Sequence, residues 1–456
     1  MSRTYHVWTI GCQMNEADSR HLSSQLEALG YHSSPTAEAA DLVVLNTCVV
    51  RQQAEDKALN QLHRLRRTKD ERPDMTVALM GCMVGMKEAT RLKKRFPFVD
   101  VFMPPSETEP LLDYLAEQGL YDAARSFDTR EKALREAIQD EEFSLPSALR
   151  GQSVTANVPV VLGCSHACTF CIIPYRRGAE RSKPPADILR EIRKLADQGV
   201  REVMLLGQII DRYGTDFDDG TDLAGLLQRV AAIPELERVR FLTSHPNWMT
   251  DRLIDTVADT EKVCPHIEIP AQAGNDEVLA NMRRGYTVDD YRRVVERIRR
   301  RMPDAAVHTD IIVGFCGETD EQFMDTYRLA EEMQWEKIHI AKYSVRPKTI
   351  AARSMPDDVP ADEKERRRKM LDDLQTEILE RKNRRLRNTD VEVLVENMHK
   401  GKWRGRTPHN KLVFFEDDRD LTGQVVRVHI DHTAPYSMFG RAADRATRCP
   451  VGAISS

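Results

Sequence analysis

The feature that most restricts the fold of this chain is a group of three cysteines, Cys164, Cys168 and Cys171, directly after the apolar run 158–162. A strand that ends in a tight turn can bring three sulfurs to one point beyond a sheet edge, where open α/β folds bind ligands. Three cysteines leave one iron of a cubane cluster open, whereas structural zinc takes four protein ligands. The spacing therefore favours an iron-sulfur cluster. A zinc site that adds His166 and a set of unligated thiols are the alternatives.

Three further cysteines stand at equivalent positions in the first 82 residues. They are Cys12, Cys48 and Cys82, and each follows an apolar run that is predicted to be a strand. Helices are predicted over 16–29 and 54–67, between these strands. Consecutive βα units of this spacing form parallel sheets, whose strands end at one edge, so the three thiols are expected to converge. A small buried residue that closes each strand is the alternative for any one of them. Three at the same position favour a second three-thiolate cluster.

The sequence around both groups of cysteines resembles a known enzyme family. Cys-x3-Cys-x2-Cys with Phe170 before the last cysteine resembles the signature of radical S-adenosylmethionine (SAM) enzymes. Gly11-Cys12-Gln-Met-Asn15, Asn46-Thr-Cys48 and Gly81-Cys82 resemble the N-terminal domain of the methylthiotransferases. The basic segment 400–411, which contains Trp403, resembles a TRAM domain, the RNA-binding tail of tRNA-modifying enzymes.

This resemblance implies two 4Fe-4S clusters and SAM as cofactors, with all six cysteines as cluster ligands and catalytic residues. In the family, the cluster of the central motif binds SAM and splits it into methionine and a 5′-deoxyadenosyl radical. Another SAM donates its methyl group to a sulfur carried on the N-terminal cluster. The radical abstracts hydrogen from C2 of the target adenine, where the methylthio group then adds.

The string Cys12-Gln-Met-Asn15 resembles the members that modify N6-isopentenyladenosine beside the anticodon of tRNA. Members that act on threonylcarbamoyl-adenosine tend to have Lys-Val-Asn after the cysteine, and those that act on ribosomal protein S12 have Pro-Lys-Asn. The chain departs from the first pattern at several positions, which are Ile209, Asp211, Glu268, Ala273, Cys316, Val345 and Lys348. Both other methylthiotransferase substrates therefore stay open as alternatives. A non-catalytic RNA-binding iron-sulfur protein is the alternative from a different class.

The predicted fold class is α/β, with three modules and one connector. A parallel α/β domain is predicted over 1–125, a charged linker with a helix at 131–142 over 126–149, a radical SAM domain over 150–382 and a small TRAM β-barrel over 383–450. Strands of the central module are predicted at 158–162, 202–206, 238–243, 266–270, 307–313 and 337–343. Its helices are predicted at 185–198, 223–231, 291–301, 320–333 and 361–388. Six βα units suggest a barrel-like sheet, and the resemblance implies an open partial (β/α)6 barrel.

Polar residues and glycines at the predicted strand ends are candidates for cofactor contacts. Gln208, Ser244 and Gln272 follow three successive strands and are the candidates for SAM binding. Arg283, followed by Arg284, is a candidate partner of the SAM carboxylate or of a tRNA phosphate, with solvent exposure as the alternative. The remaining cysteines, Cys264, Cys316 and Cys449, are interpreted as structural.

The composition of the chain limits the cellular compartment and the partners that can be expected. No run of about 18 apolar residues occurs, so no membrane span is predicted. Nine cysteines without a secretion signal indicate a reducing cytoplasm. A net charge of only −5 requires local basic patches for RNA binding. The expected partners of a monomer are a tRNA anticodon stem-loop, an electron donor such as flavodoxin or ferredoxin, and an unidentified sulfur donor.

Overall fold

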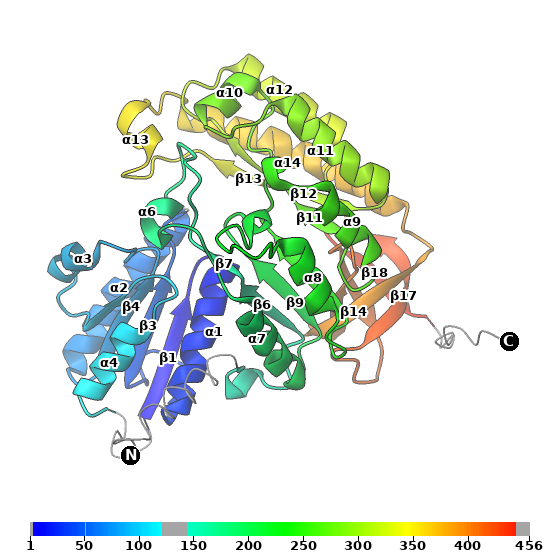
Figure 1. Ribbon diagram of the computed structural model, residues 1–456. Coiled ribbons are helices and arrows are strands. Elements are labelled where there is room, and N and C mark those ends of the chain that lie inside the picture. The colour runs from blue at the N-terminus through cyan, green and yellow to red at the C-terminus, as the bar shows by residue number, and fades with distance from the viewer. Residues whose placement is uncertain (1–2, 51, 121–143, 444–456) are drawn as a thin grey trace.

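The computed structural model describes residues 3–50, 52–120 and 144–443. Figure 1 shows three modules, with the central α/β module between the other two. The N-terminal module has a parallel five-stranded sheet in the order β2-β1-β3-β4-β5. Its strands are β1 Arg3–Thr9, β2 Tyr31–Ser33, β3 Leu42–Thr47, β4 Thr76–Gly81 and β5 Val101–Met103. Its helices are α1 Gln13–Ala28, α2 Gln52–Glu71, α3 Ala89–Arg95 and α4 Glu109–Glu117.

Alternate residues of the central strands pack on the two layers of helices. Val43 and Leu45 of β3 lie in one cluster with side chains of α2 and α3. Leu42 and Val44 lie in the other cluster, with side chains of α1 and α4. This period of two is what a strand buried on both faces requires. The predicted strands that precede Cys12, Cys48 and Cys82 are present, while β2, β5, α3 and α4 are additions. The helix predicted at 131–142 lies outside the described residues.

The central module contains six parallel strands in chain order. They are β6 Thr155–Pro159, β9 Glu202–Leu206, β10 Arg238–Leu242, β11 His266–Glu268, β12 Ala306–Val313 and β13 Lys337–Lys342. Two three-stranded sheets, β10-β9-β6 and β11-β12-β13, are joined where the Ser244 N-H donates to the Glu268 carbonyl oxygen at 2.9 Å. Within the described ranges β6 and β13 each pair with one neighbour only. The six strands therefore form the open partial barrel that the resemblance implied.

Helices surround the barrel, and their apolar side chains pack against its strands. They are α7 Pro185–Asp197, α8 Leu223–Ala231, α9 Asp251–Asp259, α10 Asp276–Asn281, α11 Val288–Arg301, α12 Asp320–Met333, α13 Ile350–Ser354 and α14 Ala361–Arg384. The predicted strand 158–162 is divided, because Val161 and Leu162 form β7 Val161–Leu162, which pairs antiparallel with β8 Arg181–Ser182. That change of direction sends the following cysteines away from β6 and toward the mouth of the barrel.

The C-terminal module is a closed β-barrel in the order β14-β15-β16-β18-β17. Its strands are β14 Asp390–His399, β15 Lys402–Arg406, β16 Leu412–Glu416, β17 Val425–Thr433 and β18 Met438–Ala442. Trp403, the aromatic residue of the basic segment 400–411, does not lie on the surface of this barrel. Trp403 is 6% exposed, lies in the barrel core beside Phe415, and donates its indole N-H to the Asp417 carbonyl oxygen at 3.0 Å.

A buried ionic cluster joins the first two modules. Glu191 of α7 is fully buried and pairs with Arg20 and His21 of α1 and with Lys183, at 2.9 Å from His21 Nε2 and 3.1 Å from Lys183 Nζ. Burial alone would raise the pKa of Glu191, but Lys183, His21 and Arg20 hold that pKa well below its usual value. The carboxylate is therefore charged at neutral pH and ties α1 to the barrel.

Replacing Glu191 with glutamine is expected to destabilise the native chain by about 3–5 kcal/mol, because buried cations lose their counter-charge. The measurement is chemical denaturation followed by circular dichroism. Glu296→Gln is the matched control, since Glu296 and Arg300 form an exposed pair, and such pairs contribute little. Equal stability of the Glu191 and Glu296 variants would contradict this account.

Candidate active site

The N-terminal cysteines follow the carboxyl ends of β1, β3 and β4. Cys12 stands at the N-cap of α1, and Cys48 and Cys82 come directly after their strands. All three line one cavity of about 430 Å³. Cys48 and Cys82 are buried, while Cys12 is exposed. The structure thus brings together three thiols that are far apart in the sequence, at the sheet edge where they were expected.

Asparagines hold the turns that carry these cysteines. The Asn15 side chain donates to Asn46 Oδ1 at 2.7 Å, and Asn46 donates back to the Asn15 carbonyl oxygen at 2.9 Å. Gly81 has φ +96°, and a Cβ there would lie 2.5 Å from the Thr47 carbonyl oxygen. Only glycine allows this close approach of two strand ends. The resulting turn places Cys82 beside Cys48.

The central cysteines lie at the mouth of the barrel. Cys164 follows β7, Cys168 lies in the loop, and Cys171 precedes α6 Ile173–Arg177. Burial raises the pKa of Cys164 to about 11 and that of Cys171 to about 12. Burial likewise raises the pKa of Cys82 to about 11. Without a metal, these thiols are protonated at neutral pH, and metal coordination is what deprotonates such sites.

Both groups of thiols fit a soft metal cluster in their chemistry. Each group supplies three sulfur ligands from one end of a parallel sheet, which is a donor set that suits iron-sulfur clusters. Across residues 3–50, 52–120 and 144–443, no three or more Cys, His, Asp or Glu side chains have the geometry to hold a metal ion. The identification of the clusters therefore depends on the donor set and on the family.

Two cations contact the cysteine sites. Arg284 is buried, and its Nη1 donates to Cys168 Sγ at 3.1 Å. Arg177 of α6 lines the cavity of the N-terminal cysteines and lies 3.4 Å from Asp18 of α1. Positive charge beside sulfur ligands stabilises their anionic form. Because Arg177 comes six residues after Cys171, one short helix links the two groups of cysteines.

The candidate SAM contacts differ in burial and in whether they line a cavity. Gln208 follows β9 and lines the cavity of about 430 Å³, and Ser244 is buried after β10. Gln272 is buried, with φ +69°, and its Oε1 has no hydrogen-bond partner among the described residues. A buried acceptor without a partner fits a site that a polar ligand completes. Arg283 is exposed, so its neighbour Arg284 is the arginine that reaches the cysteines.

Among the departures noted in the sequence, Ile209, Asp211 and Glu268 are buried or half-buried. Burial raises the pKa of Asp211 to about 7, and its Oδ2 accepts the His245 N-H at 2.8 Å. Glu268 lines the same cavity as the N-terminal cysteines. Ile209 packs against Cys164 and Ile173. The roles of Cys264 and Cys316, both buried away from the cavities, are still interpreted as structural, and Cys449 lies outside the described residues.

Comparison with known proteins agrees with the three modules. Residues 4–104 match the uncharacterized protein family UPF0004, residues 158–330 match the Radical SAM superfamily, and residues 384–443 match the TRAM domain. The fold also resembles a radical SAM methyltransferase, TsrM, from Kitasatospora setae. The TM-score is 0.55 at 15% identity, over 77% of this chain and 75% of that chain. Fold and site thus define a radical SAM enzyme, a class that uses a 4Fe-4S cluster and SAM.

Curated relatives extend the match over nearly the whole chain. A tRNA-2-methylthio-N(6)-dimethylallyladenosine synthase from Roseiflexus sp. (strain RS-1) is 46% identical over 96% of this chain and 89% of the relative. Proteins of the same name from Dehalococcoides mccartyi (strain CBDB1) and Chloroflexus aurantiacus are 45% and 44% identical, over 95% and 96% of this chain and 97% and 91% of the relatives. The chain belongs to the family of tRNA-2-methylthio-N(6)-dimethylallyladenosine synthases.

Proposed function

We propose that this enzyme transfers a methylthio group to C2 of N6-isopentenyladenosine beside the anticodon of tRNA. The observation that supports this most strongly is the composition of the cavity of about 430 Å³. Its lining includes Cys12, Cys48 and Cys82 of the N-terminal module and Ile173 and Gln208 of the radical SAM module. A sulfur carrier and a radical source must both reach the same carbon, and this shared cavity allows it.

The six cysteines are the residues proposed to hold the two clusters, and Gln208, Ser244 and Gln272 to contact SAM. When bound, these cofactors supply the radical and the sulfur, while the protein positions them. Arg284 and Arg177 place positive charge beside the two sulfur sites. Arg283 is proposed to bind a tRNA phosphate, because it is exposed near the mouth of the barrel.

The partners and the boundaries belong to the same proposal. The relatives are named for tRNA as their substrate, and the TRAM match supports an RNA-binding module at 383–450. The module boundaries at 125, 149 and 382 stay predictions. An electron donor such as flavodoxin or ferredoxin, a monomeric state and a cytoplasmic location are proposed from the chemistry of the family. No helix in the described ranges is both long and apolar enough to cross a membrane.

The decisive experiment is mass spectrometry of tRNA nucleosides from cells with and without this protein. Loss of the 2-methylthio derivative with accumulation of N6-isopentenyladenosine is the expected result. Loss of a methylthio derivative of threonylcarbamoyl-adenosine would instead support that alternative substrate. An unchanged nucleoside profile, in cells whose ribosomal protein S12 has lost its methylthio group, would identify the protein substrate instead.

A further inference from the structure

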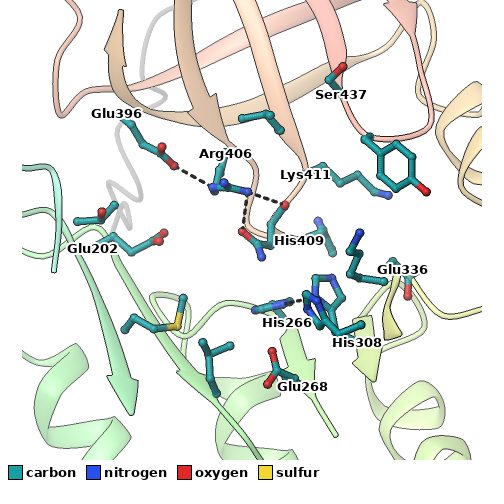
Figure 2. Close-up of a pocket in the computed structure, with 18 of the residues that line it drawn as sticks. Glu202, His266, Glu268, His308, Glu336, Glu396, Arg406, His409, Lys411 and Ser437 are labelled. Carbon is teal, nitrogen blue, oxygen red and sulfur yellow. Dashed lines mark hydrogen bonds and ion pairs between the residues drawn. The ribbon is translucent and has the colours of Figure 1, made fainter. Parts of the chain in front are cut away.

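A second cavity, of about 590 Å³, lies between the six strands of the barrel and the TRAM module. Figure 2 shows Arg406 and Lys411 reaching toward this cavity from the TRAM barrel, with His266, His308 and Glu268 on the opposite wall. It shares four lining residues with the cavity of the N-terminal cysteines, which are Gln13, Leu242, Glu268 and His339. The two cavities are therefore neighbours, and together they lead from the TRAM module to the three thiols.

The larger cavity carries charges of both signs. Its cations are Lys337, Arg406 and Lys411, and its acidic residues are Glu16, Glu202, Glu268, Glu336 and Glu396. Arg406 and Lys411 lie at the TRAM end, where Arg406 pairs with Glu396 at 3.1 Å and Lys411 donates to Asn383 Oδ1 at 2.8 Å. Cations near an RNA-binding module are the usual partners of phosphates. A cavity of this volume lies within the range for small-ligand sites. The opposite end, at Glu268, is where a base would meet protein hydrogen-bonding groups.

Glu268 stands at the junction of the two cavities. It is the last residue of β11, its side chain is half-buried, and Asp310 of the neighbouring strand β12 lines the same inner cavity. Other titratable groups on adjacent elements are His266 on β11, His308 on β12 and His339 on β13. Burial lowers the pKa of His308 to about 3 and that of His266 well below its usual value. His266 and His308 are therefore neutral and supply no counter-charge.

Burial, followed by the charge of Asp310, raises the pKa of Glu268 to about 8, although a hydrogen bond with Thr243 acts in the opposite direction. At neutral pH the side chain is accordingly a carboxylic acid. A neutral carboxyl group has one O-H donor and one carbonyl acceptor side by side, whereas a carboxylate only accepts. Glu268 can thus offer a donor and an acceptor to one ligand edge.

We propose that Glu268 recognises the target adenine by donating a hydrogen bond to N7 and accepting one from N6-H. This inference rests on the proposed function and names the residue that orients its substrate. Adenine presents an acceptor at N7 and a donor at N6 on the same edge, and the amides of Asn and Gln bind that pair in bidentate fashion. A neutral carboxyl group has the same donor and acceptor arrangement. This edge lies across the ring from C2. A base that lies beyond Glu268, in the cavity of the N-terminal cysteines, and has this edge on Glu268 therefore presents C2 to the three thiols.

The test compares three forms of the reconstituted full-length enzyme, the wild type, Glu268→Gln and Glu268→Ala. The substrates are an anticodon stem-loop with N6-isopentenyladenosine and the same stem-loop with its 7-deaza analogue, which lacks the N7 acceptor. Glu268→Gln is expected to keep kcat/KM within a few-fold, because the amide keeps a donor and an acceptor. Glu268→Ala is expected to lose kcat/KM by roughly ten- to a hundredfold, the range for one bidentate base contact.

The 7-deaza substrate separates recognition from a structural effect. It should reduce kcat/KM of the wild type by a similar order and cause little further loss in Glu268→Ala. An equal penalty from 7-deaza in both forms would overturn the proposal. Thermal unfolding, measured without RNA, should be the same in all three forms.

A pH profile gives an independent readout. The neutral form of Glu268 is present below its pKa of about 8, so kcat/KM of the wild type should fall as pH rises through this value. Glu268→Gln should lack that decline. Asp310→Asn removes a neighbouring negative charge, which lowers the pKa of Glu268 and moves the decline to lower pH. The same decline in Glu268→Gln as in the wild type would contradict the proposal.

These experiments give different results if the proposed function is wrong and if only the role of Glu268 is wrong. If the wild type releases 5′-deoxyadenosine but makes no methylthio product on the isopentenyl stem-loop, the proposed function is wrong. If the wild type makes product and Glu268→Ala matches it on both substrates, the function stands and the role of Glu268 is wrong.

Discussion

The Cys164→Ala variant is expected to release no 5′-deoxyadenosine and to make no methylthio product. Cys164 is one of the three thiols of the central motif, and its side chain is buried in contact with Ile173 and Ile209. Two thiols are too few to hold the cluster that activates SAM, so both activities should fall to background. The measurement is anaerobic incubation with SAM and dithionite, followed by chromatography of the nucleoside products and by iron analysis.

Cys264→Ala is the matched control for this variant. Cys264 is also a buried cysteine of the same module, but it lines neither cavity. Its replacement should leave release of 5′-deoxyadenosine close to the wild-type level. Normal release by the Cys164 variant would show that these three cysteines do not form the SAM-activating site.

The Cys12→Ala variant should separate the two chemical tasks. Cys12 lies in the N-terminal module, so this variant keeps Cys164, Cys168 and Cys171, the three proposed cluster ligands of the barrel. Release of 5′-deoxyadenosine should therefore persist, while methylthiolation of the stem-loop should fall to background. Liquid chromatography with mass spectrometry measures both products in one reaction.

Cys12 also suits this test structurally. It is the exposed member of its group, and its Sγ donates to Asn15 Oδ1 at 3.4 Å, so its truncation leaves no buried cavity. A folded variant that still makes the methylthio product would refute the role of Cys12 in carrying sulfur. Loss of 5′-deoxyadenosine release as well would mean that the N-terminal module is needed for SAM activation.

Several elements of the fold could be predicted because local signals were strong. Three predicted elements have the same bounds in the structure, namely the strand 202–206 and the helices 223–231 and 320–333. The strand contains the continuous apolar run 203–206, and amphipathic helices of nine or more residues leave a clear period in the sequence. The short strands β2 and β5 have only three residues each, which is too few to show a period.

The C-terminal module shows where composition misleads. The basic segment 400–411 resembles a TRAM domain as one unit, but burial alternates along β15. Trp403 and Gly405 are buried, while Lys402, Arg404 and Arg406 are half-buried. Arg404 and Arg406 both lie near Glu396, at 3.7 and 3.1 Å. Which face of a strand is buried depends on its partners in the sheet, and those partners are distant in the sequence.

The sequence by itself determined the number of thiols, their spacing and the strands that carry them, because these are properties of consecutive residues. It therefore predicted two groups of three cysteines and the class of chemistry. Only the tertiary structure decided that Arg284 contacts Cys168 while Arg283 is exposed, and that Glu268 and Asp310 line one cavity. Those relations depend on which neighbouring strands and turns approach each other. The pKa of a buried carboxyl group depends on the same long-range packing.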